Sequence, residues 1–151
     1  MIKVKLLPIL ALSIVVSSMS YSKATELTSI GSYLSKNDLG DPAVVAYLSL
    51  RCAALTGYVQ TIMPPSTPVA KLNQMEDQFN LFMMLSAQSS MSMTGDDMET
   101  VFGRLEGALK ATLDKQVKIS NDHYVSTGSY LREIDFQDFE LCSNLALALS
   151  E

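Results

Sequence analysis

Apolar residues between Asp41 and Met63 recur at steps of three and four, which is the period of one helix face. Asp41 is suited to cap the first free amides, and Pro42 suits the first helical position because it lacks an N–H. Pro64 and Pro65 end the pattern, because proline cannot continue the helical hydrogen bonds. We therefore predict a long helix over residues 41–63. Its apolar face consists of Val44, Leu48, Cys52, Leu55, Val59 and Ile62.

A short helix is expected before it, around Leu27–Leu34, and a second long helix after it. Thr67 followed by Pro68 is typical of a helix start, and the helical period continues to about Gln88. Residues 89–94 are small and polar apart from two methionines, which indicates a turn. The core face of this second helix consists of Leu72, Met75, Phe79, Phe82, Met83 and Ser86.

Two more helices complete the chain. Thr94 or Asp96 is expected to cap the third long helix, which ends somewhere between Ser120 and Arg132. A last helix follows a cap at Asp135 or at Asp138 within residues 135–149. The third helix places on its core face Met98, Val101, Phe102, Leu105, Leu109, Thr112 and Leu113; the last contains Phe139, Leu141, Cys142, Leu145, Leu147 and Leu149.

These elements predict an all-α fold. No stretch shows the alternation of apolar and polar residues that is typical of strands. Four main helices with short connections favour an antiparallel four-helix-type bundle, with the short N-terminal helix as an extra element.

The first residues have the three parts of a secretory signal peptide. Lys3 and Lys5 precede the eleven-residue apolar run Leu6–Val16, and small residues follow up to Ala24. The run is shorter than the roughly 20 residues that span a bilayer. Cleavage after Ala24 is preferred, with Ser20 and Ser22 as alternatives. We therefore expect residues 1–24 to be a signal peptide and residues 25–151 to form a single periplasmic or secreted domain, with no membrane span after cleavage.

The two cysteines, Cys52 and Cys142, lie in two different predicted helices of a chain expected to be exported. Exported compartments are oxidising, and the spacing is unlike the Cys-x-x-Cys of thiol-exchange enzymes. We therefore predict one interhelical disulfide between Cys52 and Cys142 with a structural role.

Charge narrows the range of partners. The whole chain has 11 basic and 16 acidic residues. Cleavage removes three of the basic residues and none of the acidic ones, which leaves a net charge of −8. Such a surface repels phosphate backbones, so we do not expect nucleic-acid binding. We expect no cofactor, and the sequence leaves homo-oligomer formation open.

Methionine is the most unusual residue type in the chain. Met91 and Met93 lie in the expected turn, and Met98 follows at the start of the next helix. Thioethers are soft ligands that suit Cu(I). The alternatives are that methionines fill gaps in the core, or that Met91 and Met93 form an adaptable contact surface for a partner.

A second stripe, Tyr47–Arg51–Tyr58, is predicted beside the apolar face of the first long helix. The planar guanidinium and the phenol hydroxyls could hold an anionic ligand. The alternative is structural: Arg51 pairs with Asp138 or Glu140 of the last helix, near the disulfide.

A small-residue stripe, Gly103–Gly107–Ala111, indicates close packing of another helix in the same chain, or else of a second subunit. The motifs of hydrolases, zinc proteases and phosphate-binding loops are missing, and His123 is the only histidine.

The combined expectation is an exported soluble helical protein that acts by binding, either as a chaperone-like protein or as an accessory subunit. Small periplasmic acid chaperones share this plan of an acidic helical domain with one disulfide, which is a likeness of architecture only. A Cu(I)-binding protein that uses methionines is the first alternative, and an enzyme of unknown class is the second.

Overall fold

The computed structural model describes residues 27–150, so the expected signal peptide (residues 1–24) lies outside the described residues. Between residues 27 and 150 the chain forms five helices and no strand, which confirms the predicted all-α class. In chain order the helices are α1 (Ile30–Leu34), α2 (Pro42–Ile62), α3 (Val69–Thr94), α4 (Met98–Thr127) and α5 (Glu133–Ser150).

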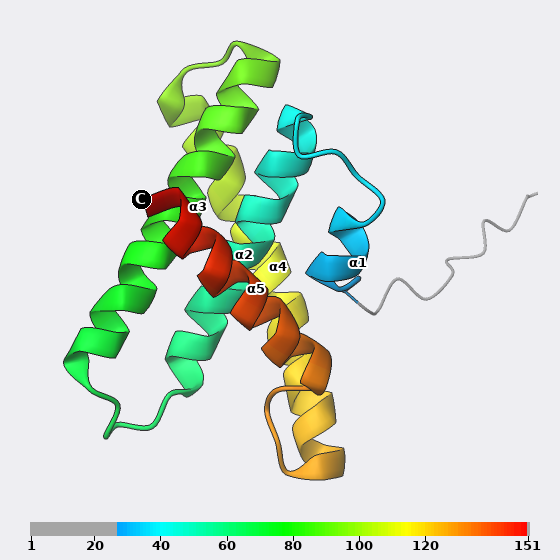
Figure 1. The fold of residues 1–151 in the computed structure, drawn as a ribbon, viewed down its shortest axis with the longest axis vertical. Coiled ribbons are helices and arrows are strands. Elements are labelled where there is room, and N and C mark those ends of the chain that lie inside the picture. Colours follow the sequence, from blue (N-terminus) through cyan, green and yellow to red (C-terminus); the bar gives the residue numbers. More distant parts are fainter. Residues whose placement is uncertain (1–26, 151) are drawn as a thin grey trace, which may run out of the picture.

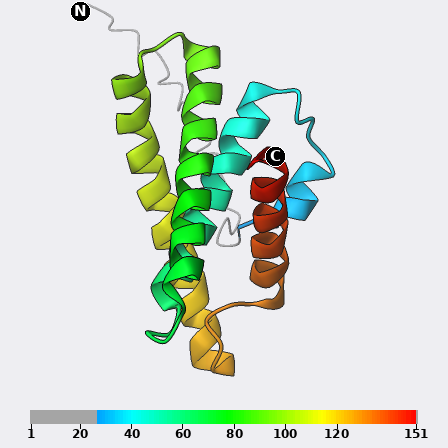
Figure 2. The ribbon, with the colours of Figure 1, turned by 60° about the vertical axis from the view of Figure 1, so that its left-hand side comes forward.

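Helix α2 is the centre of the molecule, because it packs against α3, α4 and α5. The four long helices run in alternating directions along the chain (Figures 1 and 2). Helix α5 crosses α2 obliquely in the view of Figure 1, whereas α2 and α3 lie closer to parallel. The short α1 packs against α5.

The boundaries of α2 follow the prediction. The Asp41 carboxylate accepts a hydrogen bond from the Ala43 amide at 2.8 Å, Pro42 is the first helical residue, and the helix ends at Ile62, two residues before Pro64. In the described part of the chain, α2 is long and apolar enough to cross a membrane by length and composition alone. This length and apolar character differ from the prediction of no membrane span after signal cleavage. A buried core helix passes the same test, and 61% of the qualifying window is buried inside the protein.

Helix α3 is longer than predicted, and the expected turn at residues 89–94 is wrong. The hydroxyls of Ser92 and Thr94 donate to the carbonyls of Ser89 and Ser90, so these polar side chains are satisfied within a helix. Gly95 ends the helix in a left-handed conformation with φ of 71°, which glycine adopts without steric cost. The chain therefore turns at residues 95–97, and Met91 and Met93 lie in the last turns of α3.

The start of α3 also differs from the prediction. Thr67 does not cap the helix, because its hydroxyl donates to the Pro64 carbonyl at 2.7 Å. The helix begins at Val69 after Pro68, without a side-chain cap.

The structure shows where α4 begins and where it ends, and the sequence had left its end open between Ser120 and Arg132. Asp97 caps its start by accepting from the Thr100 amide at 2.8 Å, and the helix continues to Thr127. Gly128 follows with φ of 76°. Helix α5 then begins at Glu133, so neither Asp135 nor Asp138 is its cap as predicted. Both lie inside the helix and are buried.

The core has two parts along α2. Nine of the twelve predicted core positions of α2 and α3 are buried, because these helices bury the faces that their periodicity defines. The other three, Ile62, Leu72 and Phe79, are partly buried. The first part surrounds the disulfide and contains Ile30, Leu48, Cys52, Ala53, Phe82, Met83, Ala87, Val101, Leu105, Cys142 and Ala146. The second part contains Leu55, Tyr58, Val59, Met75 and Leu131.

The small-residue stripe of α4 does not pack against residues 27–150, contrary to the first of its two predicted roles. Gly103, Gly107 and Ala111 are exposed. A Cβ atom added to either glycine would meet no heavy atom of the described structure within 4 Å. The stripe therefore borders open space.

Candidate functional site

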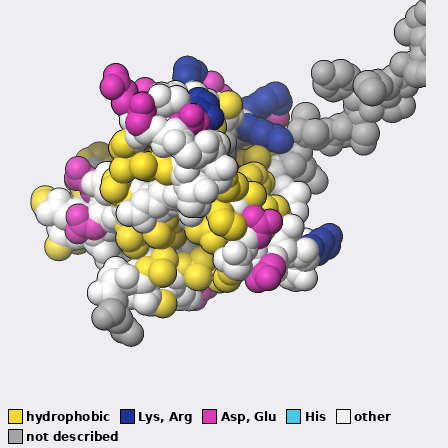
Figure 3. All heavy atoms as spheres, turned by 90° about the horizontal axis from the view of Figure 1, so that it is seen from above, with side chains coloured by type: hydrophobic (Ala, Val, Ile, Leu, Met, Phe, Trp, Pro, Cys, Tyr) yellow, Lys and Arg dark blue, Asp and Glu magenta, His cyan; other side chains and the backbone are white. Residues whose placement is uncertain are grey.

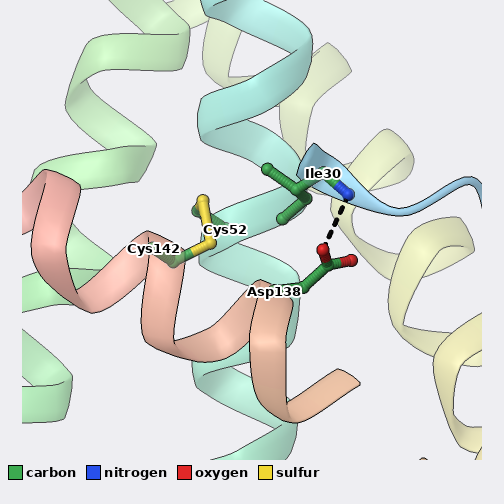
Figure 4. Close-up of a disulfide and its surroundings, with 4 residues drawn as sticks. All are labelled: Ile30, Cys52, Asp138 and Cys142. Carbon is green, nitrogen blue, oxygen red and sulfur yellow. Dashed lines mark hydrogen bonds between the residues drawn. A yellow bond between two sulfur atoms is a disulfide. The ribbon is translucent and has the colours of Figure 1, made fainter. Parts of the chain in front are cut away.

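The disulfide joins the central helix to α5. Cys52 of α2 and Cys142 of α5 are bonded, as Figure 4 shows. Their Cα atoms are 5.5 Å apart, and both side chains are fully buried. This confirms the predicted interhelical disulfide. Neither sulfur is a free thiol, so neither can join the methionines as a thiolate ligand for Cu(I).

Asp138 lies one helical turn before Cys142 and fastens α1 to α5. Its Oδ1 accepts a hydrogen bond from the Ile30 amide at 2.8 Å, drawn as the dashed line in Figure 4. Burial raises the pKa of Asp138 above its ordinary value, although the hydrogen bonds from the Ile30 and Gly31 amides and the charge of Arg51 oppose that rise. The carboxylate thus satisfies the first free amides of a helix only five residues long.

Asp135 lies in the first turn of α5 and fastens it to the preceding loop and to α4. Its carboxylate accepts three hydrogen bonds from Arg132, one from the backbone amide and two from the guanidinium, all at 3.0 Å or less. Gln116 of α4 donates to it at 3.3 Å and also donates to Ser120 at 3.3 Å. Burial would raise the pKa of Asp135, but Arg132 and Gln116 hold it below its ordinary value. These groups are mutually satisfied, so we assign them a structural role.

The Tyr47–Arg51–Tyr58 stripe is not exposed as a continuous surface. Arg51 and Tyr58 are buried at 6% and 4% exposure, and of the three only Tyr47 is exposed. Tyr47 contacts the ring of Tyr33 in α1, with ring centroids 4.5 Å apart. Among the described residues no ion pair joins Arg51 to Asp138 or Glu140, and Nη1 of Arg51 is buried without a hydrogen-bond partner. The predicted pairing of Arg51 with Asp138 or Glu140 is therefore not formed, although the charge of Arg51 opposes the rise in the pKa of Asp138.

The methionines are dispersed by the extension of α3. Residues two apart on a helix point about 200° apart, so Met91 and Met93 face nearly opposite directions. Met91 is partly buried against the core around the disulfide, whereas Met93 and Met98 are 45% and 37% exposed. Between residues 27 and 150, no group of three or more His, Cys, Asp or Glu side chains could hold a metal ion. His123 lies on α4, partly exposed.

The feature that looks most like a ligand site is an apolar pocket between α2, α3 and α5. It has a volume of about 260 Å³, and Ser49 is the one polar residue among the nine that line it. Figure 3 shows hydrophobic side chains gathered on the end of the molecule where α2 begins, with both acidic and basic side chains around them. The lining consists of Leu39, Val45, Leu48, Ser49, Phe82, Leu85, Leu145, Ala148 and Leu149.

Three parts of the chain build this pocket. The first turns of α2 form one wall and α3 a second. The third wall is the C-terminal part of α5, which the Cys52–Cys142 disulfide holds against α2. Leu39, in the loop between α1 and α2, forms the rim. Leu39 and Leu149 are 50% and 56% exposed, so the pocket opens to solvent through leucine side chains.

Sequence reasoning missed this site, although signals for it exist. Leu39 is an isolated leucine in a polar loop. Residues 145–149 are apolar at every position, which is more than one core face needs. In this chain, the apolar residues that are not needed for a core face, such as Leu39 and Leu149, therefore lie at the rim of the pocket.

Two other hollows lie on the surface of the described residues. One, of about 240 Å³, is lined by α3 and α5 and includes Asp77, Leu81 and Leu147. The other, of about 200 Å³, lies between α3 and α4 and includes Met93 and Arg104. Both have more polar linings than the apolar pocket.

Comparisons with protein-family models, with curated proteins and with solved structures find no match for this chain.

Proposed function

We propose that this chain is an exported helical protein that acts by binding rather than catalysis, and that its site is the apolar pocket. The observation that carries the proposal is the pocket lining, in which eight of nine residues are apolar and two are about half exposed to water. Exposed apolar surface of this kind is stabilised when an apolar group covers it.

The size of the pocket limits what it can hold. Sites for drug-sized ligands usually measure about 300–1,000 Å³, and this pocket measures about 260 Å³. It therefore suits one large apolar side chain or a short hydrocarbon group. A chaperone-like or accessory protein that contacts other polypeptides fits this size better than a carrier of large hydrophobic molecules.

We also propose a specific arrangement of the helices and an exported location for the protein. We take α2–α5 as an antiparallel four-helix-type bundle in which α5 is tilted, which their alternating directions support. The basic start, apolar run and small residues of the N-terminal segment support export, and the disulfide is of the kind found in oxidising compartments.

The alternative of a Cu(I)-binding protein has less support. Met91 and Met93 point to different sides of α3, and both cysteines are in the disulfide. An enzyme has the least support, because the buried carboxylates Asp135 and Asp138 already serve as hydrogen-bond acceptors within the fold.

Leu149→Asp tests the pocket, with Leu147→Asp as the matched control. Both leucines are just over half exposed near the end of α5, but only Leu149 lines the apolar pocket. N-phenylnaphthylamine, an uncharged apolar fluorophore, should bind the wild type and Leu147→Asp saturably. Leu149→Asp should weaken binding by about tenfold or more, because a carboxylate in an apolar site is poorly solvated.

Thermal unfolding provides the control for folding. Both variants should melt within a few degrees of the wild type, since surface substitutions usually change stability little. Equal fluorophore binding by the two variants, or no saturable binding by the wild type, would contradict the proposal.

A further inference from the structure

The rim of the apolar pocket is acidic on the side of the loop between α1 and α2. Asp38 and Asp41 lie within two residues of the rim residue Leu39, and both are exposed. Consecutive Cα atoms are about 3.8 Å apart, so both carboxylates lie within about one Debye length of the pocket mouth. Lys36, the basic residue of this loop, lies one residue further from Leu39 than Asp41.

The opposite wall of the pocket contains no basic side chain that would offset these carboxylates. The four acidic residues of α5 all lie between Glu133 and Glu140, before the residues that line the pocket, and the helix contains no lysine or arginine. Its C-terminal turns line the pocket, and the C-terminal end of a helix has a partial negative charge from its free carbonyls. No basic side chain in the last turn offsets that charge.

The lining itself contains no charged residue. A fatty acid or another apolar anion would therefore find no cation in the pocket and acidic groups at its mouth. A second copy of this chain is also disfavoured by charge, because the chain has a net charge of −5 before cleavage of the predicted signal peptide and −8 after it. A ligand that has a cation next to an apolar group is favoured, because the apolar group matches the lining and the cation is attracted to the acidic groups at the mouth.

We infer that the pocket binds an apolar side chain of a partner polypeptide that has lysine or arginine next to that side chain. This inference rests on the proposed binding function and adds the chemistry of the partner. The apolar side chain enters the pocket, while the neighbouring cations face Asp38, Asp41 and the end of α5. Electrostatic complementarity of this kind sets partner choice more than total affinity.

Three short peptides test the inference by titration into the ¹⁵N-labelled protein. The first has a central leucine flanked by lysines, the second replaces the leucine with serine, and the third replaces the lysines with glutamates. Amide shift changes should occur in residues 39–49 and 145–150 with the first peptide. The second and third should bind at least about threefold more weakly.

A pair of charge variants locates the effect. Asp38→Asn with Asp41→Asn removes two charges but keeps the caps of the Gly40 and Ala43 amides, since an asparagine oxygen also accepts. This rim variant should bind the lysine peptide about threefold or more weakly, with a smaller dependence on salt.

The matched control is Asp114→Asn with Asp122→Asn. It makes the same charge change on α4, which contributes no residue to the pocket. The control variant should bind the lysine peptide almost as well as the wild type does.

The outcomes separate the two proposals. If the leucine is required but lysine and glutamate peptides bind equally, the charged partner is wrong and the apolar pocket stands. If the control variant weakens binding as much as the rim variant, overall charge and not the rim is responsible, and the inference fails. If the serine peptide binds as well as the leucine peptide, the proposed function itself fails.

Discussion

Removal of the Cys52–Cys142 crosslink should cost about 4–5 kcal/mol of unfolding free energy. The disulfide closes a loop with a sequence separation of 90 residues. In the chain-entropy description, a crosslink of that length lowers the entropy of the unfolded chain by an amount worth about 4–5 kcal/mol at room temperature. Domains of this size are stable by only about 5–15 kcal/mol in total. The reduced protein is therefore expected to be folded but marginal.

Urea unfolding of three species measures this cost. The oxidised wild type, the reduced wild type, and the variant with Cys52→Ala and Cys142→Ala should unfold in order of decreasing stability. The reduced protein keeps both sulfur atoms, so its difference from the oxidised protein isolates the crosslink. The alanine variant loses an additional packing contribution on the order of 1 kcal/mol at each position, because both side chains are fully buried.

The slope of the unfolding curve and hydrogen exchange provide independent checks. The urea dependence should become steeper without the crosslink, because a longer free chain exposes more surface when it unfolds. Amides of α5 should lose more protection than those of α2 and α3, since the crosslink is a main link between α5 and α2. A reduced protein within about 1 kcal/mol of the oxidised one would refute this reasoning.

Two further predictions concern single side chains. Asp135→Asn should destabilise the protein at pH 7, and the loss of stability should shrink as the pH falls below about 4. The reason is that a carboxylate with a lowered pKa contributes stability above its unfolded pKa and loses that contribution when it is protonated. Urea midpoints at pH 7 and pH 3 check this, and an equal loss of stability at both pH values would contradict it. Gly107→Ala should raise the unfolding free energy by about 0.5–1 kcal/mol, because Gly107 lies in the middle of α4 and the added methyl group would contact no other residue. Thermal melting checks this. A loss of stability would indicate that another group packs against the stripe.

Periodicity predicted the fold class because it is a direct consequence of burial. The faces of α2 and α3 that carry apolar residues at helical spacing are the faces that these helices bury. The disulfide was also predictable, because the two cysteines occupy apolar faces of helices that had to meet. The arrangement of α5 was not predictable, since the crossing angle depends on how side chains interdigitate and not on period.

The boundary errors have a common cause. Ser89–Thr94 looked like a turn, and Asp135 and Asp138 looked like caps, because small polar residues favour such positions when their side chains bond to nearby backbone. In the fold, the hydroxyls of Ser92 and Thr94 bond within the helix, and the two aspartates bond to groups distant in sequence or in the preceding loop. Local propensity cannot reveal a partner such as Ile30, which lies 108 residues from Asp138.

The candidate site was less predictable than the fold for a related reason. Arg51 and Tyr58 have the residue types of a ligand site, but α2 is covered on nearly every side, so both became part of the interior. The pocket instead uses residues such as Leu39 and Leu149, whose types indicate only burial. A binding site made of ordinary apolar residues is defined by incomplete coverage, which depends on tertiary structure.

Helix α5 both holds the fold together and forms one wall of the apolar pocket. Its polar and covalent links to other parts of the fold are made by Asp135, Asp138 and Cys142, all in the first ten residues of the helix. In the described structure, no side-chain hydrogen bond ties residues 143–150 to another helix, and Ser150 bonds within α5 itself. The wall with Leu145 and Leu149 is therefore packed by apolar contacts, while the disulfide holds the preceding turn of α5 against α2.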